Sequence, residues 1–174
     1  MAKGLQRPPS LSKQEKRLYR SVVKKIKAAK DKQKRLALIE TLTSTKEPWA
    51  SAVLLDSLDD TNEEIRQLIV QELGERKDLD LELVAEKLDH PLWYVKSSVL
   101  NILGLKRDKS VLIHIEALLK EPNVEVRRAA ASALGHIGDK ESLPLLLQLT
   151  KDRNQFVRAS AEKAINKVSK LRFT

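Results

Sequence analysis

Hydrophobic residues recur at three- and four-residue intervals along most of the chain, which is the spacing of one face of an α-helix. Short clusters of Asp, Asn, Pro and Gly interrupt this pattern, as at residues 121–123 and 138–139. One such helical face comprises Val126, Ala130, Ala133, Leu134 and Ile137. The pattern predicts five pairs of helices, covering about residues 12–43, 47–76, 80–106, 108–137 and 139–170.

The pattern also repeats at intervals of 30 or 31 residues. Each predicted second helix carries a basic residue near its start, and we call this residue the anchor. The anchors are Arg35, Arg66, Lys96, Arg127 and Arg158, of which Arg35 is the weakest match. A leucine or isoleucine follows each anchor by seven positions, and the three middle anchors have glycine eight positions on. A period of this kind is typical of stacked helical repeats.

The motif Asp-x-x-x-x-Val-Arg-x-x-Ala-x-x-Ala-Leu-Gly resembles the short-period HEAT repeats first associated with phycobilisome lyases. The resemblance covers about residues 32–170 and is poorest in the first repeat, where no glycine follows the anchor. It implies an all-α fold, a right-handed α-solenoid of about five HEAT-like helical hairpins. It also implies a structural ladder in which turn acids and anchors join neighbouring repeats. The expected ladder residues are Arg66, Lys96, Arg127, Arg158, Asp60, Asp89, Glu121 and Asp152.

Small residues surround the fourth anchor and indicate close packing of helices there. Ala129, Ala130, Ala131 and Ala133 remove bulk from this helix. Gly135 would permit either a tight helix crossing or a helix end.

Composition supports a helical, intracellular protein. The 174 residues are 41% hydrophobic but only 3% aromatic, which disfavours β-sheet. The absence of cysteine excludes disulfides and fits a reducing, cytoplasmic setting. No run of about 18 apolar residues is present, so no membrane insertion is expected. We expect a flexible basic tail at residues 1–11 and a single solenoid domain at residues 12–174.

Charge is concentrated at the N-terminus. The net charge is +9, but residues 1–35 hold thirteen basic and two acidic residues, against 20 basic and 22 acidic in the remainder. On a helix beginning near residue 12, Leu11, Leu18, Tyr19, Val22, Val23, Ile26 and Ala29 form an apolar face. A basic face comprises Lys13, Lys16, Arg17, Arg20, Lys24 and Lys27. This face is either the polar outer surface of a terminal repeat or an anion-binding patch for nucleic acid or acidic protein.

No pattern of catalytic residues is recognisable, so we predict no enzyme, no cofactor and no metal. The histidines at 90, 114 and 136 lie in different repeats and outside any ligand motif. Neither a phosphate-binding glycine loop nor a nucleophile motif is present. Alkylpurine DNA glycosylases have a HEAT-like fold and use aromatic residues, but Trp49, Trp93 and Tyr94 fit packing at helix ends.

The second helices should present a ridge to a partner. Positions one and five after each anchor are expected to face outward, and they are small and mostly neutral. The ridge residues are Gln67, Gln71, Ser97, Asn101, Arg128, Ser132 and Lys163. Because a nucleic-acid groove would carry more Lys and Arg, the ridge favours another protein as partner.

Function is therefore predicted to be non-catalytic: a scaffold or adaptor that binds a protein through the ridge. The alternative is a nucleic-acid-associated protein that binds phosphates through the basic N-terminal helix. A third and less favoured hypothesis, a subunit similar to a bilin lyase, comes from the family resemblance.

Overall fold

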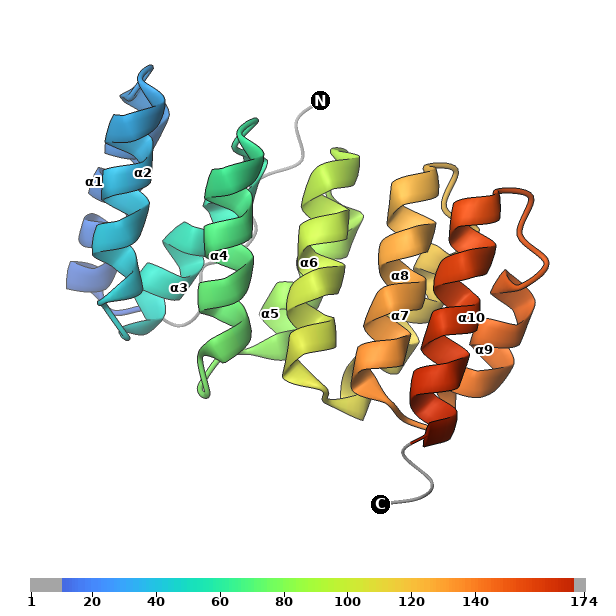
Figure 1. Cartoon of the computed structure of the whole chain (residues 1–174). Helices are drawn as coiled ribbons and strands as arrows, with labels where there is room; N and C mark the ends of the chain where they lie inside the picture. Colours follow the sequence, from blue (N-terminus) through green and yellow to red (C-terminus); the bar gives the residue numbers. More distant parts are fainter. Residues whose placement is uncertain (1–10, 171–174) are drawn as a thin grey trace. The chain divides into compact units, whose positions relative to one another are not determined.

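The computed structural model describes residues 11–170, and within that range the chain contains α-helices and short 3-10 turns but no strand (Figure 1). It divides into two compact units, residues 1–79 and 80–174. The expected tail lies outside the described residues except for Leu11, which is buried. The single domain expected at residues 12–174 stays a prediction.

The first unit contains two helical hairpins. Helices α1 (Lys13–Ala28) and α2 (Lys32–Thr43) form one, and α3 (Pro48–Asp56), its 3-10 extension η1 (Ser57–Asp59) and α4 (Glu63–Glu75) form the other. A capping box, in which Ser12 and Glu15 each accept from the other's backbone N–H, begins α1. Helix α1 packs on α3 and α2 on α4, as expected for stacked hairpins.

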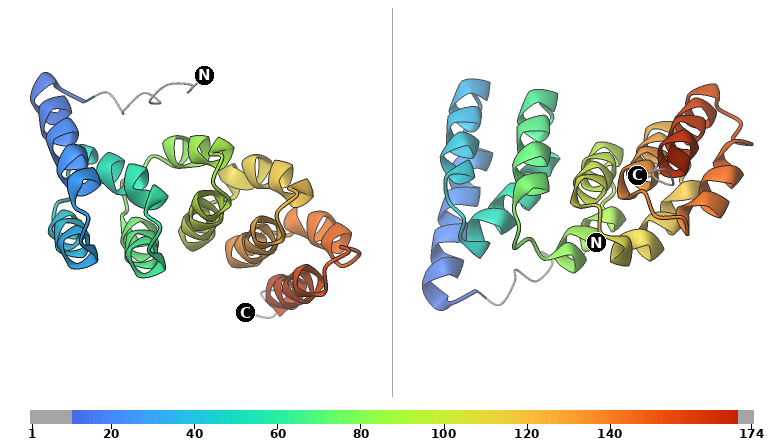
Figure 2. Two further views of the ribbon diagram at one scale, coloured as in Figure 1. Left: turned by 90° about the horizontal axis from the view of Figure 1, so that it is seen from above. Right: turned by 60° about the horizontal axis from the view of Figure 1, so that its bottom comes forward.

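The second unit contains three hairpins. Their first helices are α5 (Leu81–Ala85), α7 (Leu112–Glu116) and α9 (Ser142–Leu149). The first two are completed by the 3-10 turns η2 (Glu86–Asp89), η3 (Lys109–Val111) and η4 (Ala117–Lys120). The second helices are α6 (Trp93–Lys106), α8 (Val124–Ile137) and α10 (Gln155–Lys170), and α8 packs between α6 and α10 (Figure 2).

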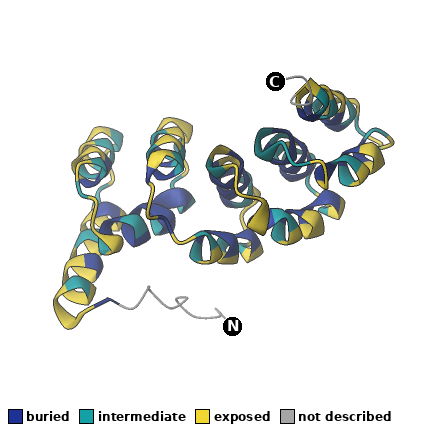
Figure 3. Cartoon of the chain, turned by 90° about the horizontal axis from the view of Figure 1, so that it is seen from below, coloured by how far each residue is buried: buried dark blue, intermediate teal, exposed yellow. Residues whose placement is uncertain are grey.

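The five predicted helix pairs and the all-α solenoid fold are confirmed. In each unit the buried residues lie where helices face one another (Figure 3). The apolar faces read from the sequence form this core, including Ile65, Ile69, Leu103, Ile115 and Leu134, which have no exposed surface. Each buried Leu or Ile of this kind contributes roughly 1.5–3 kcal/mol to folding.

Glycine lets α8 approach its neighbours closely. A Cβ built on Gly135 would lie 2.8 Å from the Ala164 Cα of α10, and one on Gly104 would lie 3.0 Å from the Ala133 Cα of α8. Of the two roles expected for Gly135, the structure shows the tight crossing. The end of α8 is formed by Gly138, which adopts the left-handed conformation with φ 72°.

Among the described helices, none is long and apolar enough to cross a membrane.

Candidate functional site

The turns before α4 and α10 are each built by one acid and one asparagine. The Asp152 carboxylate accepts from the Asn154 backbone N–H at 2.8 Å, and the Asn154 side chain accepts from the Phe156 N–H at 2.9 Å. The same arrangement occurs in the first unit, where Asp60 accepts from the Asn62 N–H at 2.8 Å. These contacts satisfy backbone donors that the start of a helix leaves free.

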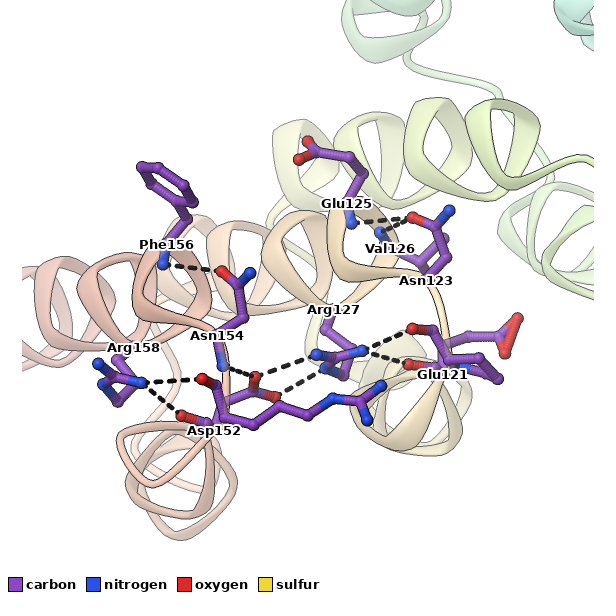
Figure 4. A network of polar contacts seen from close by, with 11 residues as sticks. Glu121, Asn123, Glu125, Val126, Arg127, Asp152, Asn154, Phe156 and Arg158 are labelled. Atoms are coloured by element: carbon purple, nitrogen blue, oxygen red, sulfur yellow. Dashed lines mark hydrogen bonds and ion pairs between the residues drawn. The ribbon is translucent and has the colours of Figure 1, made fainter.

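The anchor Arg127 joins two such turns (Figure 4). Its Nε and Nη2 donate to the two carboxylate oxygens of Asp152 at 2.7 and 3.0 Å. Its Nη1 donates to the backbone carbonyls of Glu121 and Pro122 at 2.7 and 2.9 Å. Both side chains of the ion pair are nearly inaccessible, at 5% and 9% exposure. The planar fork of arginine is suited to this combined task, because it offers five donors in one plane.

Electrostatics at this pair follow from the hydrogen bonds. The Arg127 guanidinium, helped by the Asn154 N–H, lowers the pKa of Asp152, although burial acts in the opposite direction. Hydrogen bonding to Asp152 raises the pKa of Arg127. Both groups are therefore held in their charged forms. Because both carboxylate oxygens of Asp152 accept hydrogen bonds from Arg127, we expect the pair to bind no ligand and catalyse no reaction.

Other anchors make parts of the same arrangement. Arg35 donates to both oxygens of Asp60 at 2.6 and 3.2 Å and to the carbonyls of Ala29 and Lys30. Lys96 pairs with Glu121. We call these two pairs and Arg127–Asp152 the turn ladder. Arg35 was not expected among the ladder residues, because its repeat matches the motif least well.

Two further anchors contact backbone carbonyls of their own turns. Arg66 donates to the Asp60 carbonyl at 2.8 Å, and Arg158 donates to the Asp152 carbonyl at 2.8 Å. Asp89, expected as a ladder acid, is exposed. Its neighbour His90 takes the turn position instead, because the His90 Nδ1 accepts from the Leu92 N–H at 3.2 Å, as Asp60 does from Asn62.

Arg128 differs from Arg127 in both exposure and partner. Its side chain is 52% exposed, and its Nε donates to Glu125 of the same helix at 2.9 Å. Of the other ridge residues, Gln67, Gln71, Asn101 and Lys163 are exposed. Ser97 and Ser132 are half-buried instead, and the Ser97 hydroxyl oxygen is almost inaccessible to solvent.

The basic face of α1 points to solvent at every expected position. Lys13, Lys16, Arg17, Arg20, Lys24 and Lys27 are all exposed. Lys27 lies 3.5 Å from Asp59 of η1. On the opposite face Leu11, Tyr19 and Ile26 are buried, but Leu18 is 42% exposed, so the apolar face is only partly covered.

Arg76 is a buried residue that sequence reasoning missed. Its guanidinium donates to Glu72 at 3.0 Å, to the Ser51 hydroxyl at 2.8 Å and to the Leu42 carbonyl at 2.9 Å. It thereby joins the ends of α2 and α4 to α3. The position follows the end of the helix and lies outside the repeated motif, so no periodic signal marks it.

Histidines and aromatic residues do not converge on a common site. His114 lies 3.3 Å from Glu82, and His136 contacts the Ser132 carbonyl at 2.9 Å within α8. Within residues 11–170, no group of three His, Asp or Glu side chains is placed to share a metal ion. Trp93 stacks edge-on against Tyr94 but is 45% exposed, so the expected packing at the helix end is incomplete for this residue.

A family model described as HEAT repeats matches residues 81–166 of the chain. An uncharacterized phycocyanin operon protein Z from Pseudanabaena tenuis is 33% identical over 90 residues, which covers 52% of this chain and 45% of that protein. Deoxyhypusine hydroxylase from Candida albicans is 33% identical over 97 residues, covering 54% of this chain and 30% of the enzyme. The matches thus span less than half of either relative.

A solved structure of similar fold is the complex of CpcE and CpcF of phycocyanin lyase from Nostoc. It aligns with a TM-score of 0.60 at 19% identity, covering 98% of this chain and 70% of that chain. At this identity the likeness concerns the fold.

Proposed function

Because the chain is a HEAT-repeat protein with repeats like those of phycocyanin lyase subunits, we propose that it is a non-catalytic scaffold that binds another protein through its ridge. The observation that carries this proposal is the difference between two adjacent arginines of α8. Arg127 is buried and pairs with Asp152 in the turn ladder, whereas Arg128 is exposed on the outer face. The outer face of α8 therefore does not contribute to packing between repeats.

The second unit supports the proposal because its three second helices pack side by side. Asn101 on α6, Arg128 on α8 and Lys163 on α10 are all exposed and occupy equivalent faces. A rigid row of helices loses little entropy on binding, which favours recognition by such a surface. Solenoid repeats use their exposed second-helix surfaces in this way.

Catalysis is not proposed, although some relatives are enzymes. The match covers 30% of deoxyhypusine hydroxylase, so the activity of that whole protein does not transfer to this chain. The charged side chains of the turn ladder are paired with one another, so none of them is available for catalysis. They serve packing between repeats.

The test is capture of partners from cell extract by the full chain and by variants of the ridge. We expect Asn101→Arg and Arg128→Glu to lose a partner that wild type retains, because both place a bulky or opposite charge on the contact face. Lys120→Glu, which changes an exposed residue of η4, is the matched control. A partner retained by both ridge variants would contradict the proposal.

Similarity to a phycocyanin operon protein favours a more specific form of the same function. In this form the partner is a phycocyanin-type protein or a second lyase-like subunit. Size-exclusion chromatography of the chain mixed with purified phycocyanin subunits would test it. Co-elution that Asn101→Arg abolishes is the expected result, and separate elution of the two proteins would argue against this form.

The basic face of α1 carries a second candidate function, binding of nucleic-acid phosphates. Its six cations are exposed on one face. The Lys27 Nζ lies 3.5 Å from a carboxylate oxygen of Asp59. A solvated surface ordinarily mixes charges of both signs, so a one-sign face favours an anionic partner.

A further inference from the structure

The basic face of α1 is a straight row of cations. Its six members fall within an arc of about 100° of the helix surface, and the row from Lys13 to Lys27 is about 21 Å long. Among residues 11–170, no acidic side chain forms an ion pair with five of the six: Lys13, Lys16, Arg17, Arg20 and Lys24. These five charges therefore face solvent without compensation.

Two acidic residues lie near this row, and each has a partner. Glu15 is the one acid of α1, and its carboxylate accepts from the Ser12 backbone N–H at 2.8 Å in the capping box. Asp59 of η1 lies 3.5 Å from Lys27, the last cation of the row. The number of cations that a polyanion can neutralise without competition is therefore five.

The opposite side of α1 packs on the first unit. Tyr19 and Ile26 are buried there, and the Tyr19 hydroxyl donates a hydrogen bond to Asp56 at the end of α3. Leu18 is exposed, but it points about 160° away from Arg20, because two residues advance by 200° around a helix. The arc that holds the cations thus contains no apolar residue of the kind that inserts into a membrane surface.

Exposed aromatic side chains are absent from residues 11–79. The aromatic residues there are Tyr19, which is buried, and Trp49, which is half-buried at the start of α3. Proteins that bind single strands regardless of sequence stack the bases on aromatic side chains beside a basic groove. The basic face has no such platform for unpaired bases.

The residue types in the row favour phosphates over base edges. Four of its six cations are lysines, which are compact point charges without the planar fork of arginine. No Asn or Gln lies within the arc, although bidentate Arg, Asn and Gln are the side chains that read bases best. Contacts to phosphates position a protein on nucleic acid but carry no direct sequence information.

A double helix presents more phosphates to this row than a single strand does. Duplex DNA carries one negative charge per about 1.7 Å of its axis, against about 3.4 Å for one of its strands. A row of about 21 Å therefore faces about 12 phosphates of a duplex, which is enough for every cation. The duplex is also stiff, so it can lie along a straight helix without the ordering that a flexible strand would need.

We infer that the basic face of α1 binds the phosphate backbone of double-stranded nucleic acid without reading its sequence. This inference rests on the proposed binding of nucleic-acid phosphates by the same face and adds the form of the nucleic acid. An acidic protein segment fits less well, because an extended peptide has at most one charge per about 3.3 Å, and successive side chains point to opposite sides. Such a segment also loses conformational freedom when it binds.

Fluorescence anisotropy of the full chain across a salt series tests the inference. The labelled probes are two DNA duplexes of different sequence, one of their strands alone, and polyglutamate. Five phosphate contacts predict that the logarithm of the association constant falls against the logarithm of salt with a slope of about −4.5 for the duplexes and about −3.5 for the strand. Taken from 1 M salt, this difference makes duplex binding about tenfold tighter at 0.1 M. Both duplexes should bind equally.

Single substitutions locate the contacts. Arg20→Gln and Lys24→Gln should each make the duplex slope shallower by about 0.9, because each removes one phosphate contact. Lys27→Gln should change the slope less, since Asp59 already compensates that cation. Asp59→Asn should steepen the slope, a gain that a damaged fold does not produce. Lys120→Gln, an exposed residue of η4, is the matched control and should leave the slope unchanged.

Several outcomes would overturn the inference. Equal affinity for duplex and single strand is one, and an equal effect of Lys120→Gln and Arg20→Gln is another. Polyglutamate that binds as tightly as the duplexes would identify an acidic protein segment as the partner instead. A large difference between the two duplexes would show that the face reads sequence.

Failure of this inference is distinguishable from failure of the proposed phosphate binding. If Arg20→Gln weakens duplex and single-strand binding alike, and the two affinities are equal in wild type, the face binds phosphates and the preference for duplexes is wrong. If neither form binds at physiological salt, the phosphate binding itself is wrong.

Discussion

At the residue scale, the adjacent Arg127 and Arg128 predict very different mutational costs. Arg127→Ala should lower the free energy of unfolding by about 3–5 kcal/mol, because Asp152 would remain buried without its partner. Arg128→Ala should cost less than about 1 kcal/mol, because its ion pair is exposed. Urea denaturation of both variants checks the prediction. Equal costs would contradict the assignment of Arg127 to packing between repeats.

The same ion pair predicts an acid-sensitive contribution to stability. Because the folded chain holds the pKa of Asp152 below its ordinary value, the pair stabilises the fold fully above pH of about 4 and loses that stabilisation as pH falls through the lowered pKa. The stability difference between wild type and Asp152→Asn should therefore be largest near neutral pH and shrink on acidification. Denaturation at a series of pH values measures it.

Asp89→Asn is the control for this pH series, because Asp89 is exposed. It should show a small stability difference that changes little with pH. A pH-independent cost for Asp152→Asn would contradict the prediction, since it would mean that charge on Asp152 adds nothing.

Residues with a periodic signal were predictable, and residues without one were not. Arg127 recurs with the repeat, and the family pattern predicted that it joins its own turn to an acid of an adjacent repeat, either Asp152 or Asp89. The structure pairs it with Asp152. Arg76 and Arg107 follow the ends of second helices, where chain geometry differs from repeat to repeat. Propensity alone places glycine at residue 107, so the left-handed arginine, with φ 53°, could be found only from backbone angles.

At the scale of elements, the close crossing of α8 and α10 predicts a strong response to one methyl group. Gly135→Ala would place its Cβ 2.7 Å from the Ala164 Cβ and 2.8 Å from the Ala164 Cα. We expect a loss of about 1–3 kcal/mol, despite the better helix propensity of alanine. Gly104→Ala should cost less, because the atom nearest to its added methyl group would be 3.0 Å away.

Thermal unfolding of the two glycine variants checks this order. Adding Ala164→Gly to Gly135→Ala should recover part of the loss, because it removes the overlap with the Ala164 side chain but leaves the backbone of α10 equally close. A Gly135→Ala variant as stable as wild type would show that α10 shifts freely against α8.

Second helices were easier to predict than first helices. Their apolar faces run over three or more turns, as in α8, so the helical period is unambiguous. In α5 and α7 the α-helix lasts five residues before a 3-10 turn takes over, because these segments are short and held by tertiary contacts. Hydrophobic spacing cannot distinguish the two helix types over so few residues.

At the scale of the whole molecule, the basic charge and the segment that the family model matches lie in different parts of the sequence. The basic excess lies in residues 1–35, whereas the family match covers residues 81–166. The proposed protein binding by the ridge and the proposed nucleic-acid binding by the basic face of α1 can therefore be tested separately. The sequence predicted the exposure of the basic face and of most ridge residues, because exposure follows from the helical register, but not the half-buried positions of Ser97 and Ser132. The ligands of the two surfaces depend on chemistry outside the chain.

The last prediction concerns nucleic-acid binding by the basic face of α1. Wild type should bind duplex DNA and structured RNA with an affinity that falls steeply as salt rises, because each phosphate contact releases counterions. Replacing Lys16, Arg20 and Lys24 with Glu should abolish this binding. Replacing Lys120, Lys140 and Lys151 with Glu is the matched control, since both triple variants lower the net charge from +9 to +3. If both variants lose binding equally, net charge explains it; if wild type does not bind at physiological salt, the face is the polar outer surface of the first unit.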